Sequence, residues 1–167
     1  MSSLAPFVSS PLDVVRKMLE MAEARPEDVL YDLGSGDGRI LIAAVQEFGL
    51  GKAVGVEIRP DLVKRAQEIV EENGLTDKIK ILHKNIFEVD VSEADIVTLY
   101  LTTSGNNKLR PKLDKELKKK ARVVSHDFSF SDWKPTKIEN YGGHTIYLYK
   151  MGEVVPERTE SGNKWLR

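Results

Sequence analysis

Cysteine is absent from the 167 residues of this chain. Disulfide bonds are therefore excluded, and so are metal sites built on thiolate ligands. The three histidines do not stand with Asp or Glu at the spacings typical of metal ligands, so we expect no catalytic metal.

Long apolar runs and a strong net charge are also missing. No stretch approaches the roughly 20 apolar residues of a membrane span, and the N-terminus lacks the basic-then-apolar order of a signal peptide. We therefore expect a cytoplasmic protein. A net charge of -1 creates no overall field toward nucleic acid. With 41% hydrophobic and 31% charged residues, the chain is typical of a single globular domain.

The most informative segment is a glycine-rich loop, YDLGSGDGRI, at residues 31–40. An apolar run enters this loop and an amphipathic pattern at 39–48 leaves it, which predicts a strand, a loop and a helix. In open α/β sheets this corner binds a phosphate or a nucleoside. Glycines allow the positive φ angles of a tight turn and the close approach of a ligand to the backbone.

The spacing of the glycines argues against a dinucleotide. The loop alternates as Gly34-x-Gly36-x-Gly38, and Arg39 stands where the dinucleotide fingerprint G-x-G-x-x-G has its third glycine. This difference disfavours a nicotinamide oxidoreductase.

Acidic residues around the loop indicate a cationic ligand. Asp32 and Asp37 would repel a pyrophosphate but suit a ligand that carries an ammonium and a sulfonium. Glu57 ends a second predicted strand at 53–57, about 20 residues past the loop, where a carboxylate can accept hydrogen bonds from both ribose hydroxyls.

Together, the loop, Asp32 before it and Glu57 after it resemble motif I of the class I S-adenosylmethionine-dependent methyltransferases. The resemblance implies S-adenosylmethionine as the cofactor. Asn85 and Ile86 follow the third predicted strand, where related enzymes contact the adenine; Asn85 replaces a common aspartate, and its alternative role is that of a turn residue. The candidate cofactor-binding residues are Ser10, Asp32, Gly34, Ser35, Gly36, Asp37, Glu57, Ile58, Asn85 and Ile86.

Hydrophobic periodicity predicts an α/β fold: a doubly wound, mostly parallel seven-stranded sheet that ends in an antiparallel hairpin, as in the Rossmann-like methyltransferase fold. A capping box at Ser10 is expected to open the first helix, and Asp61 is expected to cap the third. The predicted later elements are strands at 78–82, 95–101 and 121–125, a helix at 109–119 and hairpin strands at 137–140 and 144–149. We expect an N-terminal segment at 1–11 that could cover the cofactor, one domain at 12–150 and a polar, loosely docked tail at 151–167, which Trp165 could anchor.

Segments that are expected to lie around the methyl acceptor narrow the resemblance to a smaller family of methyltransferases. After strand four the sequence is YLTT (100–103), in place of the Asn-Pro-Pro-Tyr of many amine methyltransferases, which argues against the usual adenine, cytosine and glutamine substrates. Four segments resemble the small archaeal broad-specificity protein lysine methyltransferases and their mitochondrial relatives: FVSSP (7–11), LRPKL (109–113), ARVVSHDF (121–128) and WKP (133–135). The resemblance covers about residues 7–150, and Ser9-Ser10 departs from the Pro-Thr of that family.

This resemblance implies methyl transfer to lysine ε-amines of proteins. The candidate catalytic residues are Tyr100, Phe128 and Trp133, as walls of an aromatic channel, and Thr102 and Thr103, which could orient the amine. Tyr100 could instead be a packing residue that ends a strand. His126 could relay a proton, or it could be a hydrogen-bonded loop histidine.

Several alternatives remain open at this point. The enzyme could act on RNA or a small molecule, or the chain could be a non-catalytic subunit that binds S-adenosylmethionine. The lysines and arginines of residues 108–120 could contact nucleic acid, although interrupting acids favour a solvated face. We expect protein substrates with exposed lysines, loose specificity because a small chain has little surface for substrate recognition, no membrane association and a monomer.

Overall fold

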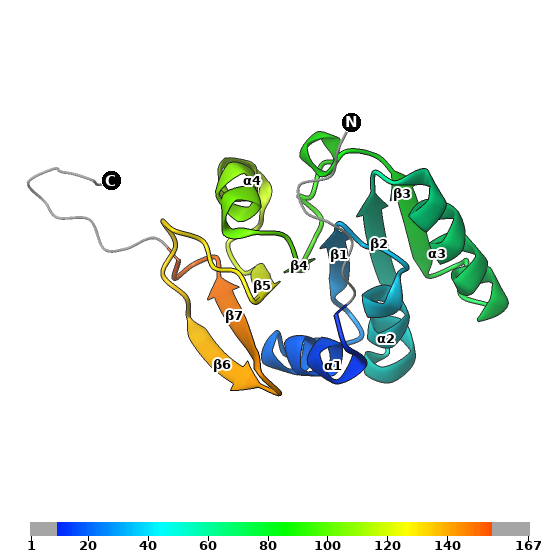
Figure 1. Cartoon of the computed structure of the whole chain (residues 1–167), viewed down its shortest axis with the longest axis horizontal. Coiled ribbons are helices and arrows are strands. Elements are labelled where there is room, and N and C mark those ends of the chain that lie inside the picture. Colours follow the sequence, from blue (N-terminus) through cyan, green and yellow to red (C-terminus); the bar gives the residue numbers. More distant parts are fainter. Residues whose placement is uncertain (1–9, 155–167) are drawn as a thin grey trace, which may run out of the picture.

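The computed structural model describes residues 10–154. Its seven strands form one sheet in the order β3-β2-β1-β4-β5-β7-β6 (Figure 1). The strands are β1 (Val29–Leu33), β2 (Lys52–Glu57), β3 (Ile79–His83), β4 (Ile96–Leu99), β5 (Arg122–His126), β6 (Lys137–Tyr141) and β7 (His144–Lys150). The first five strands pair in parallel, and β7 pairs antiparallel with both β5 and β6. The predicted fold class is confirmed.

Helices cover both faces of this sheet. α1 (Leu12–Met21) and α2 (Arg39–Phe48) lie on one face, and α4 (Thr103–Glu116) lies on the opposite one (Figure 1). α3 (Pro60–Glu72) packs against β2 and β3. Because both faces are covered, the central strands are apolar on both sides, as parallel sheets require: all four residues of β4 are buried.

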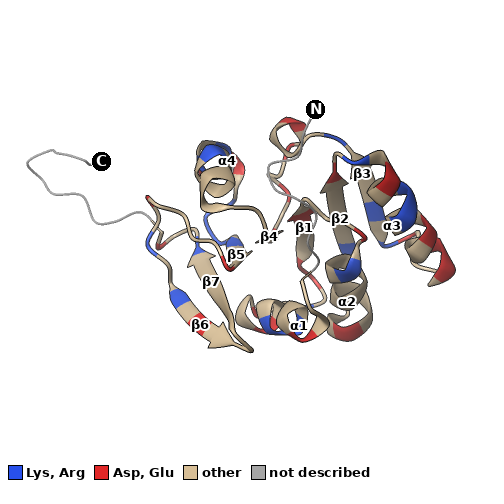
Figure 2. Ribbon diagram, in the orientation of Figure 1, with Lys and Arg blue, Asp and Glu red and all other residues tan. Residues whose placement is uncertain are grey.

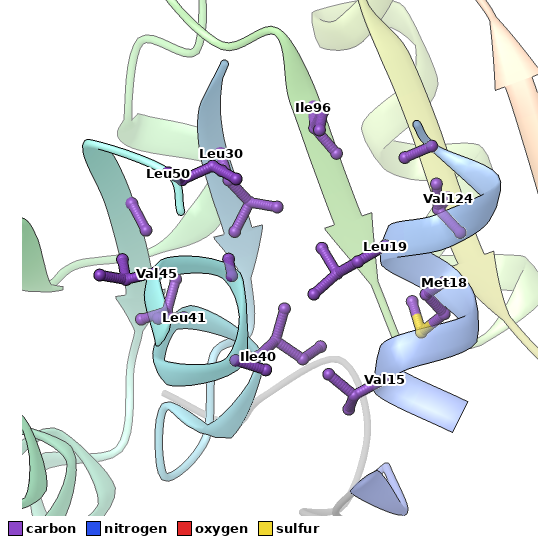
Figure 3. Packing of buried hydrophobic residues seen from close by; sticks show 14 of the residues in the cluster. Val15, Met18, Leu19, Leu30, Ile40, Leu41, Val45, Leu50, Ile96 and Val124 are labelled. Atoms are coloured by element: carbon purple, nitrogen blue, oxygen red, sulfur yellow. The ribbon is translucent and has the colours of Figure 1, made fainter. Parts of the chain in front are cut away.

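Each face has its own hydrophobic cluster. Under α1 and α2, Val15, Leu19, Ile40 and Leu41 pack on the sheet (Figure 3). On the other face, Leu109 and Leu113 of α4 pack against a different set of sheet residues, which includes Leu33, Val97, Leu99 and Val123. The strand alternation that divides residues between these clusters fixes the register of the sheet, since a one-residue slip would exchange the two faces.

Two predicted helix caps are wrong. α1 begins after Pro11, and no side chain caps it; the Ser10 hydroxyl instead forms a 2.9 Å hydrogen bond with His126 Nδ1. α3 begins after Arg59, with Pro60 in its first turn, and the Asp61 carboxylate pairs with Arg59 at 2.8 Å. A side chain caps a helix only if it accepts a hydrogen bond from a backbone N–H of the first turn. The Ser10 hydroxyl instead bonds to His126, which is distant in the chain.

α4 begins six residues earlier than predicted. The Thr102 hydroxyl accepts a 3.0 Å hydrogen bond from Gly105 N–H and caps the helix, which continues through Pro111. The segment 103–107 therefore belongs to the helix, although the sequence predicted that the helix starts at residue 109. The interior proline and Gly105 both oppose helix formation locally, so packing of Leu109 and Leu113 decides the outcome.

The β6–β7 hairpin forms one edge of the sheet, and the chain beyond it, up to residue 154, packs against the protein. Gly142 and Gly143 have φ of 58° and 82°, as the two-residue turn requires. Val154 is fully buried and its carbonyl accepts a 2.8 Å hydrogen bond from Lys134 N–H. The expectation of a loosely docked tail is therefore wrong for residues 151–154. Trp165, which was expected to anchor the tail, lies outside the described residues. So do residues 1–9 of the segment 1–11 that was expected to cover the cofactor.

None of the helices within residues 10–154 is both long and apolar enough to cross a membrane. Charge is mixed along the surface, with both signs present on α3 and α4 (Figure 2). On α4, Arg110 pairs with Asp114 and Lys112 with Glu116 across one helical turn. This pairing supports the interpretation of the basic stretch as a solvated helix face.

Candidate active site

The glycine loop is tied to the strand beside it. The backbone N–H groups of Gly34 and Ser35 both donate to the Val56 carbonyl, at 2.8 and 3.0 Å. Gly34, Gly36 and Gly38 all have positive φ, and Gly38 is the N-terminal cap of α2. The loop therefore lies at the carboxyl ends of β1 and β2, with its shape set by glycine; Gly34 is exposed, whereas Ser35, Gly36 and Gly38 are buried.

Glu57 closes this loop from the tip of β2. Its Oε1 accepts a 2.8 Å hydrogen bond from Gly36 N–H, and its Oε2 accepts 3.1 Å bonds from Ile58 and Arg59 N–H. A carboxylate has about four lone-pair sites, so about one site remains open to a ribose hydroxyl after three backbone donors. The side chain is only 5% exposed, so it is held in place before any ligand arrives.

Asp32 is a buried acid that is costly to ionise. Its Oδ1 accepts a 2.9 Å hydrogen bond from the Thr98 hydroxyl. Burial raises the pKa of Asp32 to about 8; the bond from Thr98 opposes the rise, and the charges of Glu57 and Asp37 add to it. A cation bound beside Asp32 would remove this penalty, because opposite charge favours the ionised form.

Arg39 joins the loop to the segment before α1. Its Nη2 pairs with Asp37 at 2.8 Å, and its Nη1 donates to the Ser10 carbonyl at 3.1 Å. Burial alone would raise the pKa of Asp37, but the hydrogen bonds and charge of Arg39 hold it below the usual value. Arg39 occupies the position of the missing third glycine, and this ion pair explains why an arginine suits it.

A small residue in β2 makes room for the loop. A Cβ built at Gly55 would lie 2.6 Å from Ser35 Oγ and 2.6 Å from Leu41 Cδ1. Ser35 Oγ is buried and has no hydrogen-bond partner among the described residues. Gly55 was not among the predicted site residues, because a glycine inside a strand gives no indication of which side chain crosses over it.

Asn85 has the local role of a turn residue. It precedes the short 3-10 helix η1 (Ile86–Glu88), and its Oδ1 accepts a 2.9 Å hydrogen bond from Phe87 N–H. Ile86, the next residue, is buried. The adenine contact of these two residues remains a prediction, while the turn that places them at the end of β3 is established.

Aromatic rings gather at the carboxyl ends of β4 and β5. The Tyr100 ring stacks on His126 with a centroid distance of 3.9 Å, and Phe128 lies 6.2 Å from Tyr100. Tyr100 and Phe128 are both half-buried. The sequence separation of 26 residues between Tyr100 and His126 is bridged because β4 and β5 are parallel neighbours.

His126 is a fully buried side chain with partners on both ring nitrogens. Nδ1 bonds to the Ser10 hydroxyl at 2.9 Å, and Nε2 lies 2.8 Å from His144 Nδ1. Burial lowers the pKa of His126 to about 4; Asp127 opposes this and His144 adds to it. The imidazole is therefore neutral at physiological pH, and the geometry favours a hydrogen-bonded structural histidine over a free general base.

The remaining candidate catalytic residues lie apart from this stack. Thr102 uses its hydroxyl to cap α4, and Thr103 is the first residue of that helix. Trp133 is 4% exposed and packs on Phe130 and Tyr149, and its indole N–H donates to Asp114 at 3.0 Å. These contacts are those of a packing residue, and a role for Trp133 in a lysine channel stays a prediction.

Asn106 is a residue that the sequence analysis missed. It is fully buried, and its amide nitrogen donates to Ser125 Oγ and to the Phe128 carbonyl. Within residues 10–154, its Oδ1 has no hydrogen-bond partner. Asn106 thereby fixes the turn that carries Phe128, and only the helical start of α4 at Thr103 brings it there.

Fold, loop and buried acids together define a class I methyltransferase, whose cofactor is S-adenosylmethionine. The charges of the acids around the loop are compatible with such a cofactor. Asp37 is neutralised by Arg39, and the ionised form of Asp32, whose pKa burial raises to about 8, would be stabilised by a cationic group beside it. In Figure 1 the arrowheads of the parallel strands β1 and β2 point to the same end of the sheet.

A family model described as the ANTKMT methyltransferase domain matches residues 32–137, and the chain belongs to this family. It is 47% identical over 152 residues to a protein-lysine N-methyltransferase of Saccharolobus islandicus, covering 89% of this chain and 94% of that protein. It is 33% identical over 157 residues to the mouse adenine nucleotide translocase lysine N-methyltransferase, covering 94% of this chain and 68% of that protein.

A crystal structure of another protein is similar to this chain in both sequence and fold. It is described as an RNA methyltransferase from Salinibacter ruber in complex with S-adenosyl-L-homocysteine. It is 44% identical, with a TM-score of 0.85, and the match covers 94% of this chain and 100% of that one. The predicted resemblance to methyltransferases of this family is confirmed.

Proposed function

We propose that this protein transfers a methyl group from S-adenosylmethionine to lysine ε-amines of proteins, with loose specificity. The observation that carries the proposal is 47% identity to the Saccharolobus protein-lysine N-methyltransferase across nearly the whole of both chains. The mouse relative, named for lysine methylation of the adenine nucleotide translocase, supports the same substrate atom.

The cofactor supplies a methyl group on a cationic sulfur. Glu57 presents its carboxylate to the ribose while Gly36, Ile58 and Arg59 N–H hold it still. Burial raises the pKa of Asp32 to about 8, and the cationic amino acid portion of the cofactor, bound beside it, favours its ionised form. This arrangement binds and orients the cofactor before substrate arrives, so much of the rate comes from alignment of the reacting atoms.

The acceptor must lose a proton before it can react. A lysine with a pKa near 10.4 is less than about one part in a thousand neutral at pH 7. A channel wall of Tyr100 and Phe128 disfavours the ammonium by removing water, and the sulfonium repels it. His126 is buried and engaged at both nitrogens, so in this proposal the proton leaves through water rather than through a dedicated side-chain base.

Loose specificity rests on the small size of the acceptor end. Among residues 10–154, that end consists of the segment after β4, the turn after β5 and the start of α4. Such short segments offer few contacts for the residues that flank a lysine. Exposed lysines on flexible segments are therefore the expected substrates.

The test is methylation of a whole-cell lysate by the pure protein and labelled S-adenosylmethionine, followed by protease or nuclease treatment. Label that is released by protease and maps to lysines on many proteins supports the proposal. Glu57→Ala should abolish it, and Glu47→Ala, an exposed acid paired with Arg16, should not.

RNA methylation is the second candidate, because the similar Salinibacter structure is described as an RNA methyltransferase. Greater identity to the Saccharolobus enzyme and the ion-paired surface of α4 favour protein substrates. Nuclease-released label in the same experiment would reverse this order.

A further inference from the structure

Three donor atoms converge at the junction of β5 and β7. His126 ends β5, Asp127 follows it, and His144 begins β7. His126 Nε2 and His144 Nδ1 are 2.8 Å apart, and Asp127 Oδ2 lies 3.4 Å from the first and 3.2 Å from the second. The antiparallel pairing of β5 with β7 creates this triangle from residues 17 and 18 positions apart.

A single proton between the two imidazole nitrogens cannot make all three contacts of this triangle favourable. At 2.8 Å, one imidazole nitrogen donates and the other accepts. Whichever nitrogen accepts also faces Asp127 Oδ2, so a lone pair then points at a negative carboxylate. A cation at the centre of the triangle would turn all three contacts into favourable ones.

We propose that His126, Asp127 and His144 bind one divalent transition-metal ion, with zinc the preferred species, at the carboxyl end of β5. Two imidazole nitrogens and one carboxylate oxygen suit zinc and its neighbours, whereas magnesium and calcium prefer oxygen ligands throughout. The site adjoins the proposed acceptor wall, because Tyr100 stacks on His126, but the proposal does not rest on the lysine activity.

The distances fit such an ion with little movement. Zinc–ligand bonds of about 2.0–2.2 Å in tetrahedral geometry separate ligand atoms by about 3.3–3.6 Å. The two edges of the triangle that include Asp127 measure 3.4 Å, within this range, and 3.2 Å, just below it; the 2.8 Å edge between the histidines must widen most.

Contacts outside the triangle orient two of the three proposed ligands, His126 and Asp127. The Ser10 hydroxyl holds His126 Nδ1 and Tyr100 stacks on the ring, which leaves Nε2 facing the triangle. Thr145 N–H donates to Asp127 Oδ1 at 3.0 Å and leaves Oδ2 facing it. Such outer partners are the usual companions of metal ligands.

The backbone at Asp127 provides an independent indication of a constrained site. Its φ is 66°, a left-handed value that non-glycine residues adopt uncommonly. Phe128 N–H bonds to the His126 carbonyl around it, and the turn places the Asp127 carboxylate beside both rings. The Asp127 and His144 side chains are 30% and 29% exposed, so an ion has a path from solvent.

The experiment is titration of the full chain, without an affinity tag and freed of metal, with zinc alone by calorimetry. One zinc per chain is expected. Asp127→Asn and His144→Gln should each weaken binding at least about 100-fold, beyond the usual effect of losing an outer partner. Asp132→Asn and His83→Gln, which alter a nearby exposed acid and the remaining histidine, should bind zinc as the parent does.

Thermal melting completes the test, because zinc should raise the midpoint of the parent and not that of Asp127→Asn or His144→Gln. Circular dichroism without zinc establishes that each variant is folded. The proposal is overturned if the parent shows no saturable binding of one zinc, if both ligand variants keep it, or if the controls lose it equally. Because no methyl acceptor takes part, these results stand apart from those of the lysate experiment.

Discussion

The cofactor end and the acceptor end of this sheet are built by different means. At the cofactor end, backbone N–H donors hold the Glu57 carboxylate: Gly36 of the glycine loop, 21 residues before it, and its chain neighbours Ile58 and Arg59. At the acceptor end, Tyr100 and Phe128 are brought together with His126 by side-chain stacking between strands. Backbone-fixed geometry tolerates little sequence change, whereas a side-chain wall can be altered one residue at a time. Binding of the cofactor and choice of acceptor should therefore respond to different substitutions.

The largest expected effect follows from breaking the cofactor end. Glu57→Gln places an amide N–H₂ against backbone donors, so we expect the dissociation constant for S-adenosylhomocysteine to rise about 100-fold, within the range of about 1.5–3 kcal/mol for one hydrogen bond to a charged group. Calorimetry measures it. Glu47→Gln is the matched control, and an unchanged constant in Glu57→Gln would contradict the assigned role of Glu57.

A substitution at the acceptor end should separate turnover from cofactor binding. Tyr100→Ala removes one wall beside His126, and we expect kcat/KM for a lysine peptide to fall about 30-fold, or about 2 kcal/mol. The affinity for S-adenosylhomocysteine should stay within about twofold. Tyr141→Ala, at an exposed tyrosine of β6, serves as control. Equal losses of cofactor affinity and turnover would show that the two ends are not separable.

The cofactor end and the acceptor end of the sheet also differ in how much of each could be predicted from the sequence. Glycine spacing and the distance to Glu57 are local signals, so the loop, its strand and its helix were found from sequence. The cap at Thr102 and the position of Asn106 depend on α4 passing through Gly105 and Pro111, two residues that disfavour helices. Ser10 resembled a helix cap, but its partner is His126, 116 residues away. Partners set by strand pairing leave no mark in sequence spacing.

The pH dependence sharpens the account of Asp32. Its folded pKa of about 8 lies above the unfolded value near 3.8, so the folded protein holds a proton that the unfolded chain has lost. Stability of the cofactor-free protein should therefore fall as pH rises from about 4 to about 8, by up to about 1.4 kcal/mol per pH unit. Asp32→Asn should remove this slope in urea unfolding measured across that range, and Thr98 can still donate to its amide oxygen. A slope that persists in Asp32→Asn would assign it to other groups.

Ionisation of Asp32 should also be linked to binding of the cofactor. If bound cation favours ionised Asp32, cofactor binding below pH 8 releases a proton and its affinity rises with pH up to about 8. Calorimetry in buffers of different ionisation enthalpy counts the released proton. No release at pH 6 would place the cationic group away from Asp32.

The smallest kinetic effect is expected at Trp133. Trp133→Phe loses the bond to Asp114, and we expect about 2 kcal/mol less stability with kcat/KM within about twofold of the parent. Urea unfolding and peptide kinetics measure the two quantities. A tenfold loss of kcat/KM at unchanged stability would instead restore Trp133 to the lysine channel.

The most direct test of the central claim compares three acceptors under identical conditions by release of S-adenosylhomocysteine: an unstructured peptide with several lysines, the same peptide with arginine at each lysine, and total RNA. The account predicts release with the lysine peptide alone, and mass spectrometry should find methyl groups on its ε-amines. Release with RNA and none with the lysine peptide would keep the fold and cofactor and contradict the assignment of lysine as the acceptor.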